Sequence, residues 1–117
     1  MAAVRIRRGD VVLVNLGPGK GKEQRGRSRP GVIVQNDLGN QYSPTTIVVP
    51  LTAAVGKQVY PFQALVSKGT GGITKDSIAK CEQVRVVDCG RITKKLGRLN
   101  LAAIKEIDAA LRVSLAL

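Results

Sequence analysis

The sequence predicts a mainly β fold that ends in one helix: a small, strongly bent antiparallel sheet or barrel of five or six short strands, followed by a C-terminal amphipathic helix. Two patterns support this prediction. Short runs rich in valine and isoleucine alternate with clusters of glycine, proline and asparagine, and the hydrophobic period lengthens from two to about 3.6 near residue 100. The chain has 117 residues, of which 44% are hydrophobic, so residues 1–117 are expected to form one domain.

The first two strands flank a basic loop. Residues 10–16 (DVVLVNL) are apolar at nearly every position and are followed by Gly-Pro-Gly, which indicates a buried strand that ends in a loop. Residues 20–29 carry five cations and one carboxylate without any periodicity, and Pro30 ends this loop. The second strand is expected over residues 31–36, and the composition of residues 37–44 is typical of a turn.

Three more strands are expected after this turn. Residues 45–52 (TTIVVPLT) form the third, and residues 60–67 alternate as a half-buried strand does. Residues 68–72 contain three glycines and indicate a hairpin-like turn. The longest expected strand covers residues 77–88, with a bulge at residues 81–83. Its apolar residues on alternate positions are Ile78, Val84 and Val86.

The end of the chain predicts an amphipathic helix over residues 100–115. Leucine and isoleucine recur there at spacings of three and four, which places them on one helical face. Asn100 is suited to the N-cap position, because its side-chain oxygen can accept a hydrogen bond from the first turn.

The charge balance predicts a polyanionic partner and excludes several kinds of site. There are 19 Lys and Arg residues against 8 Asp and Glu, a net charge of +11, which attracts nucleic acid, an anionic membrane or an acidic protein. Histidine is absent and the carboxylates are scattered, so we expect no metal site and no cofactor. Residues 17–22 (GPGKGK) lack the spacing of a phosphate-binding loop, because only three residues separate Gly17 from the Gly-Lys pair and Glu23 follows.

The sequence also predicts a cytoplasmic protein. The N-terminus has no apolar signal sequence, and the longest apolar stretch, residues 47–55, is shorter than the roughly 20 residues of a membrane span. Two cysteines, Cys81 and Cys89, are too few for a disulfide framework and are expected to be reduced, buried thiols.

The basic loop contains the best candidates for chemistry. Glu23 is its single acid, so ion pairing with the neighbouring cations is expected to keep it ionised and to orient it. Arg29 directly precedes Pro30, which favours an extended backbone and a well-defined side-chain position at the junction with the second strand. The planar guanidinium of arginine is suited to binding a phosphate.

Four motifs carry a family resemblance that runs from about residue 8 to the C-terminus. They are E-Q-x(4)-R-P at residues 23–30, Q-N-D at residues 35–37, P-T-x-I-V-x-x-x-T at residues 44–52, and a Gly-Asp pair before the first apolar run. The pairs Asp76-Ser77 and Glu82-Gln83 add to them. With these motifs the chain resembles the MazF/PemK (Kid) toxins of bacterial toxin–antitoxin modules.

The resemblance implies a fold, an activity and a set of site residues. It implies an SH3-like β-barrel with added helices, a homodimer, and a metal-independent endoribonuclease that cuts single-stranded RNA at a short sequence. The expected products carry a 2′,3′-cyclic phosphate and a 5′-hydroxyl, so the nucleophile is the 2′-OH of the RNA. The catalytic arginine of the family falls on Arg29 and the catalytic threonine on Thr52; Glu23 and Gln24 match its loop pair, and Gln83 matches a glutamine near bound RNA.

General acid–base chemistry suggests separate roles for Glu23 and Arg29. A guanidinium with a pKa above ~12 is a poor base, so Glu23 is favoured as general base and Arg29 as acid or charge stabiliser. Some accounts of the family give the arginine both proton transfers, and that alternative stays open. Arg25 and Arg27 add cations that relatives often lack, which should raise phosphate affinity and steepen its dependence on salt.

Three polar residues outside the loop are further candidates for RNA binding, beside Gln24, Arg25 and Arg27 in the loop. Ser77 and Gln83, together with Asp76, are expected either to bind RNA or to satisfy backbone groups of the loops. The three aromatic residues are too few for a platform that stacks several bases, so sequence choice should rest on hydrogen bonds to base edges.

The resemblance also implies partners, and two other functions remain to be tested. A small acidic antitoxin whose flexible tail folds onto the RNA groove would complement the charge of +11, with any contact to DNA made by the antitoxin. The alternatives are a non-catalytic, basic RNA-binding barrel and a gyrase-binding toxin of the CcdB type.

Overall fold

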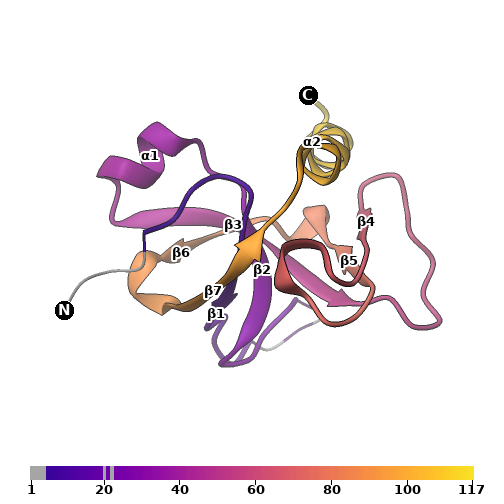
Figure 1. Ribbon diagram of the computed structural model, residues 1–117, viewed down its shortest axis with the longest axis horizontal. Helices are drawn as coiled ribbons and strands as arrows, with labels where there is room; N and C mark the ends of the chain where they lie inside the picture. Colours follow the sequence, from indigo (N-terminus) through magenta and orange to yellow (C-terminus); the bar gives the residue numbers. More distant parts are fainter. Residues whose placement is uncertain (1–4, 20, 22) are drawn as a thin grey trace.

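The computed structural model describes residues 5–19, 21 and 23–117, and within them seven strands form one antiparallel sheet (Figure 1). The strands are β1 (Asp10–Val14), β2 (Arg29–Ile33), β3 (Thr45–Ala53), β4 (Ala64–Val66), β5 (Ser77–Ala79), β6 (Arg85–Asp88) and β7 (Ile92–Arg98). The α-helices are α1 (Asp37–Tyr42) and α2 (Leu101–Leu115), and short 3₁₀ turns occupy η1 (Thr70–Gly72), η2 (Cys81–Gln83) and η3 (Cys89–Arg91).

The strand order explains the bend of the sheet. The order is β4-β5-β3-β2-β1-β7, and β6 also pairs with β3. The first half of β3, from Thr45 to Val48, pairs with β6, whereas its end, from Leu51 to Ala53, pairs with β5. One long strand therefore belongs to two pairings that diverge, and the sheet curls beneath α2 (Figure 1). This confirms the predicted class of a small, strongly bent antiparallel sheet with a C-terminal helix.

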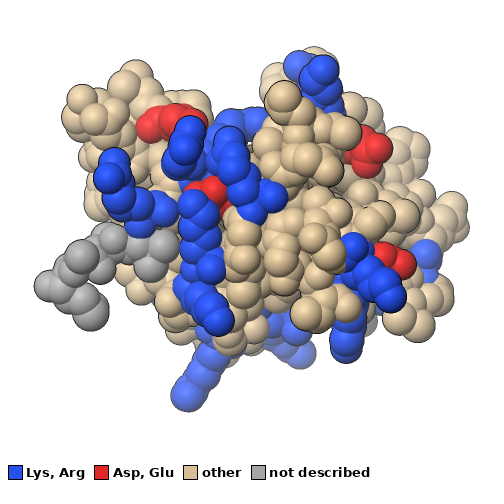
Figure 2. All heavy atoms as spheres, viewed as in Figure 1, with Lys and Arg blue, Asp and Glu red and all other residues tan. Residues whose placement is uncertain are grey.

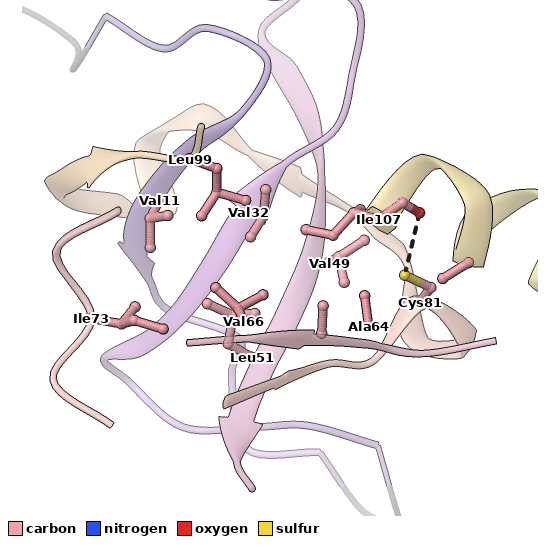
Figure 3. Packing of buried hydrophobic residues seen from close by; sticks show 12 residues of the cluster. Val11, Val32, Val49, Leu51, Ala64, Val66, Ile73, Cys81, Leu99 and Ile107 are labelled. Atoms are coloured by element: carbon pink, nitrogen blue, oxygen red, sulfur yellow. Dashed lines mark hydrogen bonds between the residues drawn. The ribbon is translucent and has the colours of Figure 1, made fainter. Parts of the chain in front are cut away.

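Both faces of β1 are buried, which accounts for its unbroken apolar run. Val11 belongs to a cluster with Val32, Leu51 and Ile107 of α2 (Figure 3), and its neighbour Val12 belongs to a second cluster on the opposite face. Successive side chains of a strand point to opposite faces, so a strand between two apolar layers needs apolar residues at every position. The helix covers the first of these layers.

The helix prediction is confirmed in detail. α2 begins at Leu101, and the side chain of Asn100 accepts a hydrogen bond from the backbone N–H of Ala103 at 2.9 Å, as expected of an N-cap. Ile107 and Ala110 are its buried residues.

The expectation of a single strand over residues 77–88 is wrong. β5 and β6 are separate strands that pair with different parts of β3, and η2 lies between them where a bulge was expected. The break also shifts the alternation, because Val86 is 60% exposed while Val87 is buried; Ile78 is buried as predicted. A β-strand cannot make the change of direction that the two pairings require, whereas a 3₁₀ turn can.

The sequence did not predict β7 or α1, and it predicted other strands with different lengths. β7 carries four polar or charged side chains among its seven residues, and its pairing with β1 is irregular, so it shows little apolar alternation. The expected turn at residues 37–44 contains α1, which the side chain of Asn36 caps through the N–H of Gly39 at 2.8 Å. The expected strand at residues 60–67 shortens to β4, and the one at residues 31–36 begins at Arg29 and ends at Ile33.

Candidate active site

Arg29 at the start of β2 and Thr52 near the end of β3 lie at the same end of the paired strands. The antiparallel pairing ends with Gly31 opposite Pro50, and each of the two residues lies two positions beyond that pair. Both residues line one cavity of about 440 Å³, to which β5 adds Ser77. The fold therefore brings together an arginine, a threonine and a serine from three different strands.

Two polar side chains of this cavity, which we call the Arg29–Thr52 cavity, are buried. Thr52 is 8% and Ser77 is 6% exposed. The Thr52 Oγ1 accepts a hydrogen bond from Lys57 Nζ at 3.3 Å, and the Ser77 hydroxyl donates to the carbonyl of Lys75 at 2.9 Å. Apolar side chains complete the wall: Leu13, Leu51, Ile73 and Leu96. A charged ligand would meet oriented donors in a partly dry setting, where electrostatic interactions are strong.

Two nitrogens of the Arg29 guanidinium, Nη2 and Nε, differ in their contacts. Its Nη2 donates to the Gln24 Oε1 at 3.2 Å. Its Nε is buried and has no hydrogen-bond partner among the described residues. Buried polar groups of native proteins are nearly always satisfied, so this nitrogen is expected to gain a partner in a water molecule or a bound ligand.

Glu23 and Gln83 line a neighbouring cavity of about 610 Å³ instead. This cavity lies between the β1–β2 loop and η2, and Arg85 and Arg91 also line it. The N–H of Gly21 donates to the Glu23 Oε1 at 3.1 Å. Lys20 and Lys22, two of the cations expected to orient Glu23, lie outside the described residues. The predicted base is thus placed beside the Arg29–Thr52 cavity, not within it.

Gln24 connects the two cavities. Its backbone N–H donates to the side-chain oxygen of Gln83, while its own side chain accepts from Arg29. Three residues proposed from sequence as RNA contacts therefore also satisfy backbone groups. Gln83 holds the β1–β2 loop through Gln24, Ser77 donates to the carbonyl of Lys75, and Asp76 accepts from the N–H of Lys68 at 2.9 Å.

Arg25 and Arg27 are exposed on the outer side of the loop. Together with Arg91 they line a shallow hollow of about 540 Å³. Lys and Arg side chains also gather over the face drawn in Figure 2, on the side where Figure 1 shows β7 and the segment before β1. The positive charge is thus spread beyond the loop, as expected for binding a polyanion along an extended path.

The Gly-Asp pair of the family motif has a structural role. Asp10 is fully buried, and its carboxylate accepts from the N–H of Arg7 at 2.7 Å and pairs with Lys95 at 3.2 Å and Arg98 at 3.3 Å. It thereby ties the start of β1 to β7. Within the described part of the chain, no three His, Cys, Asp or Glu side chains gather as metal ligands. No helix there is long and apolar enough to cross a membrane.

Sequence reasoning missed Lys57, which contacts Thr52, and Lys75, which lines the Arg29–Thr52 cavity. Lys57 follows Gly56, whose positive φ of 66° indicates a tight turn after β3, and its N–H donates to the carbonyl of Ala54 at 3.1 Å. A glycine three residues beyond the end of a strand is a turn signal. That signal predicts a chain reversal, which would have suggested that Lys57 returns toward Thr52.

A comparison with protein families decides the identity. The model of the PemK-like, MazF-like toxins of type II toxin–antitoxin systems matches residues 7–115. The chain belongs to this toxin family. A curated relative named Endoribonuclease MazF, from Staphylococcus saprophyticus, is 43% identical over 112 residues, which cover 96% of this chain and 92% of that protein. This PemK/MazF chain is accordingly an endoribonuclease toxin of the MazF type, which confirms the resemblance.

Solved structures agree on the fold of this MazF-type chain. MazF from Deinococcus radiodurans is similar, with a TM-score of 0.80 and 21% identity, over 97% of this chain and 99% of that one. An endoribonuclease in complex with its cognate antitoxin, from a mycobacterial species, has a TM-score of 0.75 and 22% identity, over 96% of each chain.

Proposed function

We propose that this toxin cuts single-stranded RNA without a metal ion, by attack of a ribose 2′-OH on the adjacent phosphorus. The bond from the 2′-oxygen to phosphorus forms as the bond from phosphorus to the 5′-oxygen breaks. A base takes the proton of the 2′-OH and an acid supplies a proton to the 5′-oxygen. The products are a 2′,3′-cyclic phosphate and a 5′-hydroxyl. The placement of Arg29 and Thr52 in one cavity carries this proposal.

Arg29 and Thr52 are the proposed catalytic donors. In the transition state, negative charge accumulates on the non-bridging oxygens of the phosphorane, where a guanidinium and a hydroxyl can both donate. Arg29 lines the cavity, so its guanidinium can donate to these oxygens once RNA is bound. Removing one preorganised donor of this kind commonly lowers the rate about 10²- to 10³-fold.

Glu23 is the proposed base, and Arg29 the proposed acid. Because Glu23 lines the adjacent cavity, this assignment requires that bound RNA spans both cavities or that the β1–β2 loop moves toward Thr52. If Glu23→Gln cleaves as fast as the wild type at every pH while Arg29→Ala is inactive, the arginine performs both proton transfers.

The remaining loop residues are proposed to bind the RNA strand. Arg25 and Arg27 are exposed cations for phosphates, and Gln24, Ser77 and Gln83 are polar groups at or between the two cavities. These residues are therefore expected to contact several successive nucleotides on both sides of the cut.

We also propose a homodimer that a small acidic antitoxin inhibits in the cytoplasm, with DNA bound only through that antitoxin. The net charge of +11 favours an acidic partner. Among the structural neighbours is a MazE–MazF complex from Deinococcus radiodurans, with a TM-score of 0.75 and 21% identity.

The proposed reaction is tested by incubating the purified protein with single-stranded RNA in excess EDTA. Arg29→Ala and Thr52→Ala are compared with the exposed controls Arg112→Ala and Thr93→Ala. Cleavage to a cyclic phosphate that persists in EDTA, is lost in the first two variants and is retained in the controls is the expected result. Loss of wild-type cleavage in EDTA would contradict the metal-independent mechanism.

The same assay separates the alternative functions. Total cellular RNA is used beside a defined oligonucleotide, so that a missing cut sequence is not mistaken for inactivity. RNA that is bound and left intact in both samples would indicate a non-catalytic binding barrel. Intact RNA together with a stable gyrase complex would indicate a toxin of the CcdB type.

A further inference from the structure

A second hollow, of about 260 Å³, lies on the other side of Thr52. The loop between β3 and β4 forms most of it, and β5 and the residue after β5 form the rest. Its polar lining consists of Thr52, Lys57, Gln58, Tyr60, Gln63 and Lys80. Apart from Thr52, none of these residues belongs to the proposed catalytic or RNA-binding set. Because Thr52 lines both this hollow and the Arg29–Thr52 cavity, a ligand here would touch the proposed catalytic centre.

A tight turn folds Lys57 back onto Thr52. The N–H of Lys57 donates to the carbonyl of Ala54, and Gly56 between them has a φ of 66°. The N–H of Ala54 in turn donates to the carbonyl of Asp76 at 2.9 Å, which anchors the turn beside the start of β5. The 3.3 Å contact from Lys57 Nζ to Thr52 Oγ1 follows from this geometry.

The ring of Tyr60 is held at the edge of the hollow. It stacks on Phe62, with ring centroids 5.4 Å apart and planes 1° from parallel, and yet Tyr60 remains 46% exposed. Gln63 fixes the loop: its side-chain oxygen accepts from the N–H of Tyr60 at 3.2 Å, and its side-chain nitrogen donates to Glu82 at 2.9 Å. Two of the three aromatic residues of the chain thus form one supported stack beside Thr52.

The charge of the hollow is suited to a phosphate. Lys57 and Lys80 line it, and its lining contains no carboxylate. Lys80 is positioned by its own backbone, whose N–H donates to the carbonyl of Pro50 in β3 at 2.9 Å. The backbone of Lys80 is thereby tied to the strand that carries Thr52.

We propose that this hollow is a subsite for one nucleotide of the RNA strand next to the scissile phosphate, an inference that rests on the proposed function. The base stacks on Tyr60, the amide of Gln58 donates to or accepts from the base edge, and Lys57 and Lys80 bind the flanking phosphate. Aromatic stacking combined with cations and an amide is how proteins bind unpaired bases. The hollow of about 260 Å³ has room for a single base, which would stack on the face of Tyr60 that Phe62 does not cover.

The subsite also bears on catalysis. Because the Thr52 Oγ1 accepts a hydrogen bond from Lys57, the proton of the hydroxyl is directed away from Lys57 and is free to be donated to a phosphoryl oxygen. Lys57 is therefore a positioning residue for Thr52, in addition to its contact with the flanking phosphate.

Binding to an uncleavable RNA tests the stack. The cut site of the wild type is mapped, and an oligonucleotide of that sequence is made with 2′-deoxyribose at the attacking position. Tyr60→Leu is expected to bind it about 5- to 150-fold more weakly, the range for loss of one stacked base. Tyr60→Phe, which keeps the ring, should bind like the wild type, and so should Tyr42→Leu, which alters an exposed tyrosine of α1.

An abasic scan of the same oligonucleotide locates the stacked base. One position next to the cut should lose affinity for the wild type when its base is removed, and the same removal should cost nothing more in Tyr60→Leu. Equal affinity of Tyr60→Leu and the wild type, or additive losses at every position, would overturn the subsite.

The lysine contact has its own readout. Lys57→Met should reduce the slope of log affinity against log salt by about 0.7, the value for one phosphate contact on a single strand, whereas Lys68→Met on the exposed β4–β5 loop should leave the slope unchanged. An unaltered slope in Lys57→Met contradicts the assignment of Lys57 to a phosphate.

Wild-type cleavage with no effect of the Tyr60 or Lys57 variants on RNA binding would overturn the subsite alone. Absence of wild-type cleavage would overturn the proposed function, and binding to a mixed-sequence oligonucleotide would then test the subsite.

Discussion

Gln24 and Arg29 are joined by a hydrogen bond of 3.2 Å, from the guanidinium Nη2 of Arg29 to the side-chain oxygen of Gln24. Gln24 is itself held by Gln83, which accepts a hydrogen bond from its backbone N–H. The position of the proposed catalytic arginine therefore depends on η2, more than 50 residues further along the chain. The glutamine of the loop pair and the glutamine of the η2 pair are thus in direct contact.

Gln24→Ala is expected to lower kcat about tenfold. The variant removes a hydrogen bond to a charged group, and a loss of about 1.4 kcal/mol in the transition state corresponds to that factor. Because Gln24 is also a proposed RNA contact, KM should rise as well. Cleavage of a short RNA over a range of RNA concentrations measures both constants, and Gln41→Ala, on the exposed surface of α1, is the matched control. A raised KM with normal kcat would leave Gln24 as an RNA contact and contradict its role in positioning Arg29.

RNA affinity is expected to fall steeply between about 50 and about 200 mM salt. Arg25→Ala and Arg27→Ala should each reduce the slope of log affinity against log salt by about 0.7, because each exposed guanidinium would displace counterions from one phosphate. Fluorescence anisotropy at four salt concentrations measures the slope. A flat response of the wild type would show that the basic loop does not contact the RNA backbone.

Asp10→Ala is expected to lower the free energy of unfolding by about 3 kcal/mol. The carboxylate is fully buried and has three partners, so its loss leaves the cations of β7 and the N–H of Arg7 uncompensated. Lys95→Met should cost far less, since Arg98 still neutralises Asp10 and Lys95 is partly exposed. Urea denaturation of both variants measures the difference, and equal losses would contradict this account.

Cys81 is expected to make stability fall as the pH rises above 9. Its thiol is buried, and this burial, together with the nearby Glu82 and Asp108, raises its pKa from 9.0 to about 12. The folded protein therefore keeps a proton that the unfolded chain loses first, so the stabilisation is complete below pH 9 and is lost between pH 9 and about 12.

Urea denaturation at two values of pH tests this linkage. From about pH 8 to about pH 10, the wild type should lose about 1 kcal/mol more than Cys81→Ala, in which the titrating thiol is absent. The comparison of two proteins cancels the titration of lysines and tyrosines. Equal losses in the two proteins would contradict the raised pKa.

The family could be predicted from the sequence because its motifs are continuous segments. The resemblance of the E-Q-x(4)-R-P loop and of the strand that ends in Thr52 also supplied the candidate site residues, whose roles stay a prediction. The helix after Asn100 was equally accessible, since a cap and a 3.6-residue period are both local.

The division of the candidate residues between cavities was decided by the tertiary structure alone. Glu23 and Arg29 are six residues apart in one loop, but they line different cavities, whereas Arg29 and Thr52 share one because β2 and β3 pair in antiparallel register. The role of Lys57 likewise depends on a turn that reverses the chain at Gly56. Local sequence determines which residues can perform chemistry, but long-range strand pairing determines which of them meet, because that pairing is set by burial over the whole sheet.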